Sequence, residues 1–209
     1  MKERIFFIGI FLAIMAMLPV VAVKCSSAND NTDTNSATAD NATDSDFENN
    51  NDKNKILCGL VAAQYEDNYC NETLKAIAIL INTDYSLNPD SFDTSNKEVC
   101  IFEEDAENSL KENYSKIESA VNSVAELKIN INDEIKHIPY CDTSNGNTFE
   151  NKKYDYLCSV ASPWDCYSES YNKSTECVGV SLNGVDYLCQ NGASAEEALK
   201  WYLPESEIK

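Results

Sequence analysis

The chain has little positive charge. Its 209 residues include 16 Lys and Arg against 35 Asp and Glu, which gives a formal net charge of -19. Binding the phosphates of a nucleic acid takes a basic face, and the sequence offers none. We therefore expect no nucleic-acid partner. The acidity is spread along the chain, a pattern more typical of solubility than of one site.

Histidine is nearly absent, and the cysteines are not spaced for zinc. His137 is the only histidine, and no Cys-x-x-Cys pair occurs. The usual zinc signatures are therefore missing, and we expect neither a metal nor a cofactor. His137 falls in a predicted strand without a partner at ligand spacing, which favours a structural role.

Cysteine, in contrast, is abundant, with nine in the chain. Apart from Cys25, they stand at positions 58, 70, 100, 141, 158, 166, 177 and 189. An even number in an exported domain fits a disulfide framework, whose connectivity the sequence does not reveal. Free buried thiols that act as small apolar residues are the alternative. Both interpretations stay open at this point.

The N-terminus begins with basic residues and then runs apolar over residues 5–23. At about 1.5 Å per residue this run reaches roughly 28 Å, near the hydrocarbon thickness of a bilayer. We predict that residues 1–25 form a membrane anchor, with a cleaved signal peptide as the alternative. Basic residues before the run and acidic residues after it place the bulk of the chain outside the cell. The protein is thus expected to be a single-pass membrane protein with an extracytoplasmic domain, or secreted.

The next segment, residues 26–54, consists mainly of Ser, Thr, Asn, Asp and Ala. Such a composition buries too little apolar surface to order itself, which predicts a disordered polar and acidic linker. The folded domain is then expected over residues 55–209.

Apolar residues at helical spacing predict two helices in this domain. The first is marked by Leu74, Ile77 and Ile81, with Asn71 as its N-cap. The second is marked by Leu110, Tyr114, Ile117 and Val121.

A β-hairpin and a final helix complete the predicted elements. Residues 127–131 alternate between apolar and polar, Asn132-Asp133 supplies a turn, and residues 134–141 follow as a weaker strand. Ser194 and Glu197 have the spacing of a capping box, and a helix that starts there would stop at Pro204. Helices, then strands, then a helix indicate a single α+β domain rather than repeated βαβ units.

Several blocks of this domain resemble the stage II sporulation protein D and amidase enhancer (SpoIID/LytB) family. They are GLVAAQY (59–65), ETLKAIA (72–78), PYCDTSNGNT (139–148), YLCSVASPWD (156–165), VGVSLNG (178–184) and NGASAEEALKWYLP (191–204). The first two are similar to the family's Gly-Val-Val-x-x-Glu-Met-Pro segment and the helix that follows it. The third is similar to its His-x-x-Ser-x-Gly-x-Thr segment. The resemblance covers residues 56–209 discontinuously and implies a role at bacterial peptidoglycan.

The resemblance also implies a lytic transglycosylase whose catalytic acid is the Glu of the first block, where this chain has Gln64. In that reaction one carboxyl group protonates the leaving oxygen and then takes a proton from the sugar's own 6-hydroxyl. A glutamine can hydrogen-bond a sugar but cannot transfer the proton. Loss of general acid catalysis typically costs about 10²–10⁴-fold. The chain is therefore predicted to be a pseudoenzyme unless another acid substitutes.

Glu66 and Asp67 are the nearest candidates for that substitute, and Glu66 is the favoured one. On an extended segment it would point to the same side as Gln64. A solvated loop carboxylate is the alternative interpretation.

Other residues match positions of the family's blocks where a glycan could bind. They are Lys75, Ser144, Asn145, Gly146 and Ser181. Hydroxyls and amides suit sugar hydroxyls, although Asn-Gly is also common turn chemistry. Trp164 could stack on a sugar ring, although packing is the simpler role for a tryptophan beside a proline.

These observations predict an extracytoplasmic protein that binds peptidoglycan glycan strands in wall remodelling or sporulation, with lost or weak cleavage. Its expected partners are glycan strands, a wall amidase or other sporulation proteins, and the membrane through the N-terminal segment. An active lytic transglycosylase is one alternative. A cysteine-rich secreted interaction domain unrelated to the family is the other.

Overall fold

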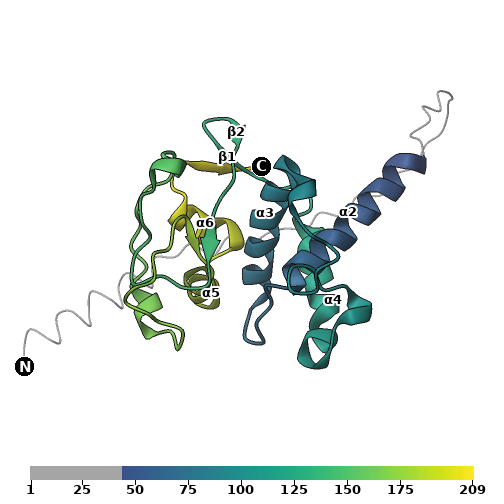
Figure 1. Cartoon of the computed structure of the whole chain (residues 1–209), viewed down its shortest axis with the longest axis horizontal. Coiled ribbons are helices and arrows are strands. Elements are labelled where there is room, and N and C mark those ends of the chain that lie inside the picture. The colour runs from purple at the N-terminus through teal and green to yellow at the C-terminus, as the bar shows by residue number, and fades with distance from the viewer. Residues whose placement is uncertain (1–43) are drawn as a thin grey trace, which may run out of the picture. The chain divides into compact units, whose positions relative to one another are not determined.

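The computed structural model describes residues 44–209, which form helices and two small sheets (Figure 1). The helices are α2 (Asp44–Ala62), α3 (Asn71–Leu87), α4 (Asn108–Ser123), α5 (Leu182–Gln190) and α6 (Ala195–Tyr202). The strands are β1 (Ile129–Ile131), β2 (Glu134–Ile135), β3 (Tyr140–Cys141), β4 (Val180–Ser181) and β5 (Ser206–Ile208). This mixture of helix and sheet agrees with the predicted α+β class.

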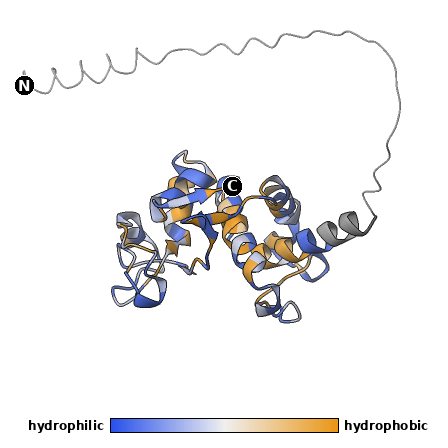
Figure 2. Ribbon diagram, turned by 90° about the horizontal axis from the view of Figure 1, so that it is seen from above, coloured by the Kyte–Doolittle hydropathy of each residue, from blue (hydrophilic) through white to orange (hydrophobic). Residues whose placement is uncertain are grey.

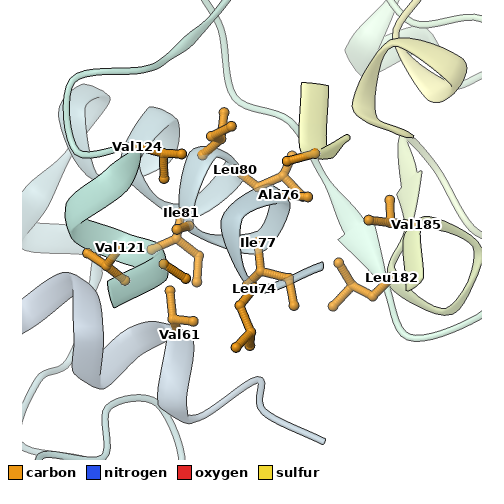
Figure 3. Packing of buried hydrophobic residues seen from close by; sticks show 14 of the residues in the cluster. Val61, Leu74, Ala76, Ile77, Leu80, Ile81, Val121, Val124, Leu182 and Val185 are labelled. Carbon is orange, nitrogen blue, oxygen red and sulfur yellow. The ribbon is translucent and has the colours of Figure 1, made fainter. Parts of the chain in front are cut away.

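Helix α3 lies at the centre of these elements and contacts α2, α4, α5 and α6 (Figure 1). Its side chains are apolar and buried on almost every side, as expected for a helix enclosed by its neighbours. Figure 3 shows Ile77 with Val61 and Val121 on one side and Leu182 on the other. The hydrophobic core therefore surrounds α3.

Both helices predicted from apolar spacing are confirmed as α3 and α4. The predicted N-cap of α3 is wrong by one position, because Cys70 and not Asn71 precedes the first helical residue. The Cys70 carbonyl accepts the first helical hydrogen bond, from the N–H of Leu74 at 3.1 Å. Asn71 consequently begins the helix itself.

The predicted hairpin is confirmed. Asn132 and Asp133 have φ of 54° and 62°, the left-handed pair that a two-residue turn between twisted strands requires. Strand β1 pairs antiparallel with β2 on one side and with the C-terminal β5 on the other.

The predicted strand over residues 134–141 is wrong as a single element. Strand β2 ends at Ile135, and β3 joins a second sheet in which it pairs parallel with β4. Pro139 lies between them and has no N–H with which to continue a ladder. The chain therefore changes sheets there.

The boundary predicted between linker and domain also needs correction. Helix α2 begins at Asp44, so residues 44–54 of the predicted linker are helical. Its last turns bury Leu57, Leu60 and Val61. Because adding a residue to an existing helix is easier than nucleating one, these anchored turns let the helix extend back through the polar stretch.

The predicted anchor (1–25) and the rest of the linker (26–43) lie outside the described residues. Within residues 44–209, none of the helices combines the length and the apolar character needed to cross a bilayer.

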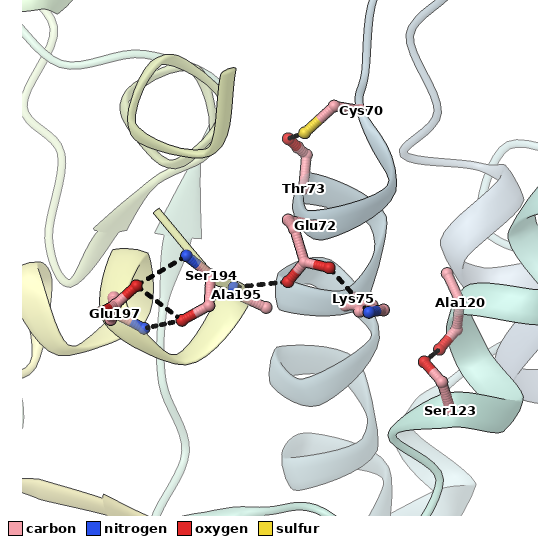
Figure 4. Close-up of polar contacts among 9 residues, drawn as sticks. All are labelled: Cys70, Glu72, Thr73, Lys75, Ala120, Ser123, Ser194, Ala195 and Glu197. Carbon is pink, nitrogen blue, oxygen red and sulfur yellow. Dashed lines mark hydrogen bonds and ion pairs between the residues drawn. The ribbon is translucent and has the colours of Figure 1, made fainter. Parts of the chain in front are cut away.

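Helix α6 begins with the predicted capping box (Figure 4). The Ser194 hydroxyl accepts a hydrogen bond from the N–H of Glu197 at 3.3 Å, and the Glu197 carboxylate accepts one from the N–H of Ser194 at 2.9 Å. The helix ends at Tyr202, two residues before Pro204, as predicted.

Residues 142–179 run largely without helix or strand, and Figure 2 shows hydrophobic colour concentrated on the helices around α3. A disulfide joins Cys141 to Cys177, with the two Cα atoms 5.8 Å apart. The free thiols of the described residues are Cys58, Cys70, Cys100, Cys158, Cys166 and Cys189. In the described region, one pair of cysteines thus forms a disulfide, and Cys58, Cys100 and Cys189 are free buried thiols. Each of the two interpretations is confirmed for some of the cysteines.

Candidate functional site

The loop between α2 and α3 carries Gln64 and Glu66. The N–H of Gln64 donates to the carbonyl of Val61 at 3.0 Å, so the chain turns tightly as α2 ends. Gln64 is half-buried, whereas Glu66 is exposed. The extended segment that the sequence analysis assumed for these two residues is therefore absent from this loop, and the alternation of side chains along a strand does not relate them.

Glu66 lies in an acidic neighbourhood assembled from three parts of the chain. Although the residue as a whole is exposed, desolvation of its carboxyl, then Asp142 and Asp186, raise the pKa of Glu66 above the ordinary value. Asp142 directly follows β3, and Asp186 belongs to α5. The phenol of buried Tyr69 is close to the same three carboxylates, and its pKa is raised by burial and by their charges.

Asp186 is the buried member of this group and is held firmly in place. Its carboxylate accepts hydrogen bonds from the Thr73 hydroxyl at 2.7 Å and the Gln190 amide at 2.6 Å. Burial nevertheless raises its pKa, because desolvation penalises the charged form. The Thr73 contact joins α5 to the first turn of α3, next to the loop that carries Glu66, whereas the Gln190 contact lies within α5.

A second polar cluster surrounds Asp165, which is fully buried. Its carboxylate accepts hydrogen bonds from the N–H of Ser144 at 3.0 Å, the Ser144 hydroxyl at 2.5 Å and the Ser162 hydroxyl at 2.8 Å. Its other oxygen accepts one from the Asn183 side-chain amide at 2.7 Å. A buried carboxylate with this many donors is well compensated for its lost hydration.

The cluster continues to the C-terminal helix. The hydroxyls of Ser162 and Tyr202 lie 2.7 Å apart. Since the Ser162 proton goes to Asp165, Tyr202 donates to Ser162, and the indole N–H of Trp164 donates to Tyr202 at 3.1 Å. Gly184 permits this approach, because a Cβ there would overlap the Tyr202 hydroxyl.

Two of the predicted glycan-binding residues belong to this buried cluster. Ser144 and Ser181 are both fully buried. The Ser144 hydroxyl donates to Asp165, and the Ser181 hydroxyl caps α5 by accepting a hydrogen bond from the N–H of Gly184 at 3.2 Å. In this conformation both serines hold the site together rather than face solvent.

Asn145 and Gly146 lie at the edge of the same cluster. The Asn145 amide donates to the carbonyl of Lys173 at 3.2 Å. Gly146 has φ of 110°, the left-handed conformation that favours glycine, and its carbonyl accepts from the N–H of Ser162 at 2.8 Å. The turn chemistry expected of Asn-Gly is present, and Asn145 remains partly accessible.

Lys75 lies elsewhere, at the junction of α3 and α6 (Figure 4). Its ammonium contacts Glu72 at 2.7 Å, and the other oxygen of Glu72 accepts from the N–H of Ala195 at 3.0 Å. Lys75, followed by the Ala195 N–H, lowers the pKa of the Glu72 carboxyl. The contacts of Lys75 therefore support the packing of two helices.

The partners of these residues are not predictable from the sequence. Asp142 and Asp186 surround Glu66, yet neither stands at a spacing that links it to the α2–α3 loop. His137 likewise has a partner, since its Nδ1 lies 2.9 Å from the carboxylate of Asp84. That pair borders a cleft of about 620 Å³ lined by apolar residues that include Leu87 and Phe92.

No family model matches the chain, and no curated protein matches it either. The function is therefore inferred from the arrangement of the residues.

Proposed function

We propose that this chain is an extracytoplasmic protein of the stage II sporulation protein D type that binds the glycan strands of peptidoglycan with little or no cleavage. Its role would be in wall remodelling or sporulation, beside a wall amidase or other sporulation proteins, with residues 1–25 as its membrane anchor.

The observation that carries the proposal is the convergence of segments that are far apart in the sequence. Glu66 neighbours Asp142 and Asp186, and the N–H of Asn183 donates to the carbonyl of Asp142 at 2.9 Å. Ser144 and Asn183 share the carboxylate of Asp165. Three blocks that resemble the family thus meet beside the loop with the replaced acid.

The identity of residue 64 decides between binding and cleavage. Gln64 can donate and accept hydrogen bonds with sugar hydroxyls, but its amide does not exchange a proton as a carboxyl group does. Binding without efficient cleavage is the chemistry that this residue supports.

A working lytic transglycosylase is the second candidate, and one observation favours it. The pKa of Glu66 is raised by desolvation and two neighbouring carboxylates, and a general acid needs a raised pKa to stay protonated near neutral pH. Glu66 would then protonate the leaving oxygen in place of residue 64.

One experiment separates these candidates. The full chain, purified in detergent, is incubated with glycan strands freed of stem peptides, and the products are examined by mass spectrometry for anhydro-muramic ends. The natural protein is expected to yield almost none. Gln64→Glu is expected to raise the yield by about 10²–10⁴-fold, the usual contribution of a positioned acid.

The control pair is Glu66→Gln and Asp67→Asn, which remove one charge each from the same loop. Cleavage by the natural protein that Glu66→Gln abolishes and Asp67→Asn preserves would replace the proposal with the second candidate. Cleavage by neither the natural protein nor Gln64→Glu, together with no retention on the strands, would overturn both.

A further inference from the structure

Large exposed apolar side chains are few in the described region, and two of them lie together. Tyr187 on α5 is 48% exposed, and Trp201 on α6 is 45% exposed. Trp164 joins them. Its ring centroid lies 5.2 Å from that of Tyr187, with the planes 9° apart, and 5.4 Å from that of Trp201. We name Trp164, Tyr187 and Trp201 the aromatic platform.

Hydrogen bonds to the rest of the protein fix both indoles of the platform. The indole N–H of Trp164 donates to the Tyr202 hydroxyl at 3.1 Å, and that of Trp201 donates to the carbonyl of Ala161 at 2.9 Å. Both indoles thus use their one polar group inside the protein. Trp164 is half-buried and stacked on Tyr187, and the exposed rings of Tyr187 and Trp201 are ordered by these contacts, so that binding would cost little side-chain entropy.

Packing of α5 and α6 does not account for the exposed rings. Helix α6 buries Ala195, Ala198 and Leu199, and Trp201 falls outside that stripe. Helix α5 buries Leu182, Val185 and Cys189, and Tyr187 falls outside that stripe. A single exposed apolar residue needs no explanation, whereas a contiguous exposed apolar patch marks an interaction site. The cluster of three rings is therefore a candidate binding surface.

The ligand chemistry follows from the rings and from the charge. Flat aromatic faces attract the slightly positive C–H groups on one face of a pyranose ring. The net charge of -19 disfavours anionic polymers, so a neutral sugar fits best. In peptidoglycan glycan the neutral sugar is N-acetylglucosamine, because muramic acid carries a carboxyl group once its stem peptide is removed.

We propose that the aromatic platform is a stacking subsite for N-acetylglucosamine units of a glycan strand, an inference that rests on the proposed function. Helix α5 connects this subsite to the acidic neighbourhood of Glu66. Asp186 faces that neighbourhood, and Tyr187, the next residue, belongs to the platform.

Tryptophan fluorescence can report binding to the aromatic platform directly. It has two tryptophans, and both belong to the platform. Titrating the full chain in detergent with a chito-oligosaccharide, a neutral polymer of N-acetylglucosamine, should produce a saturable change in tryptophan emission. Trp201→Ala should weaken binding about tenfold, which corresponds to the loss of one good aromatic contact. Trp201→Phe should retain most of it.

The matched control is Tyr167→Ala, which removes another aromatic ring that is 90% exposed. It should bind like the natural protein, and near-ultraviolet circular dichroism should show that each variant is folded. Equal binding by Trp201→Ala and the natural protein would overturn the proposal.

Retention on purified glycan strands, measured in parallel, separates failure of the subsite from failure of the function. Retention of the natural protein that Trp201→Ala does not reduce would reject the platform while the proposed function stands. No retention would reject both. An emission change with neutral phosphatidylcholine vesicles and none with the oligosaccharide would make the platform a lipid-contacting surface instead.

Discussion

The core around α3 and the segment 142–179 are stabilised by different interactions. The first buries aliphatic side chains of α3, among them Leu74, Ile77 and Leu80, against those of the four helices around it. The second buries mostly polar side chains and is closed by one disulfide. A hydrophobic core tolerates small changes of shape, whereas a buried polar cluster depends on each partner. The four predictions below test this contrast.

The largest effect is expected from Asp165→Ala. At least two fixed donors, the N–H of Ser144 and the amide of Asn183, would lose their acceptor inside the protein. Each buried donor left unsatisfied costs about 1–3 kcal/mol, so the free energy of unfolding should fall by about 3–5 kcal/mol. Urea denaturation measures this change. A loss no larger than that from an exposed substitution such as Glu169→Ala would contradict the role assigned to the cluster.

Replacing both Cys141 and Cys177 with serine should have the next largest effect. The disulfide closes a loop over a sequence separation of 36 residues, and the entropy of such a loop in the unfolded chain predicts a loss of about 2–4 kcal/mol. Denaturation with and without reductant provides the measurement. Reductant should destabilise the natural protein and leave the double variant unchanged; destabilisation of both by the same amount would point to another bond.

Removal of one methylene group from the core should lower the free energy of unfolding by less. Ile77 is 1% exposed, and Ile77→Val removes one buried methylene group. The expected loss is about 0.5–1.5 kcal/mol, also measurable by urea denaturation. If Ile77→Val destabilised the protein more than Asp165→Ala did, the contrast between the two regions would be reversed.

The smallest effect concerns Glu72 and pH. Its pKa is lowered from the ordinary value of 4.5, chiefly by Lys75. A carboxyl group with a lowered folded-state pKa stabilises the fold above its unfolded pKa, and this stabilisation disappears as the pH falls through the folded value. The natural protein should therefore be slightly more stable than Glu72→Gln at pH 7 and lose that advantage as the pH falls from the ordinary value of 4.5 through the lowered pKa of Glu72.

Thermal denaturation across this range tests the pH prediction, with Glu196→Gln as a control in the first turn of α6. A difference between the natural protein and Glu72→Gln that did not change with pH would show that shape, not charge, is the contribution of Glu72.

The sequence predicts the parts of the fold that depend on near neighbours. Apolar spacing locates α3 and α4, Asn132-Asp133 locates the hairpin, and Ser194 with Glu197 locates the start of α6. Each is a pattern within a few residues of chain, where the physical cause is local.

Contacts between distant segments are not predictable in this way. The pairing of Cys141 with Ser181, and the bonds from Ser144 and Asn183 to Asp165, join segments whose sequences say nothing of one another. For the same reason the neighbours of Glu66 were missed.

The aromatic platform left only a partial signal in the sequence. Tyr187 and Trp201 fall outside the apolar stripes of α5 and α6, so neither is needed for the packing of its helix, but one exposed ring alone does not indicate a binding surface. Their proximity to Trp164, however, depends on the packing of three segments.

The central claim is that this chain binds glycan, and sedimentation with insoluble glycan strands tests it most directly. The full chain in detergent is mixed with strands freed of stem peptides, and the bound fraction is measured over a range of strand concentrations. Saturable retention that soluble chito-oligosaccharide competes away is the predicted result. A chain that stays in the supernatant at every concentration would contradict the account.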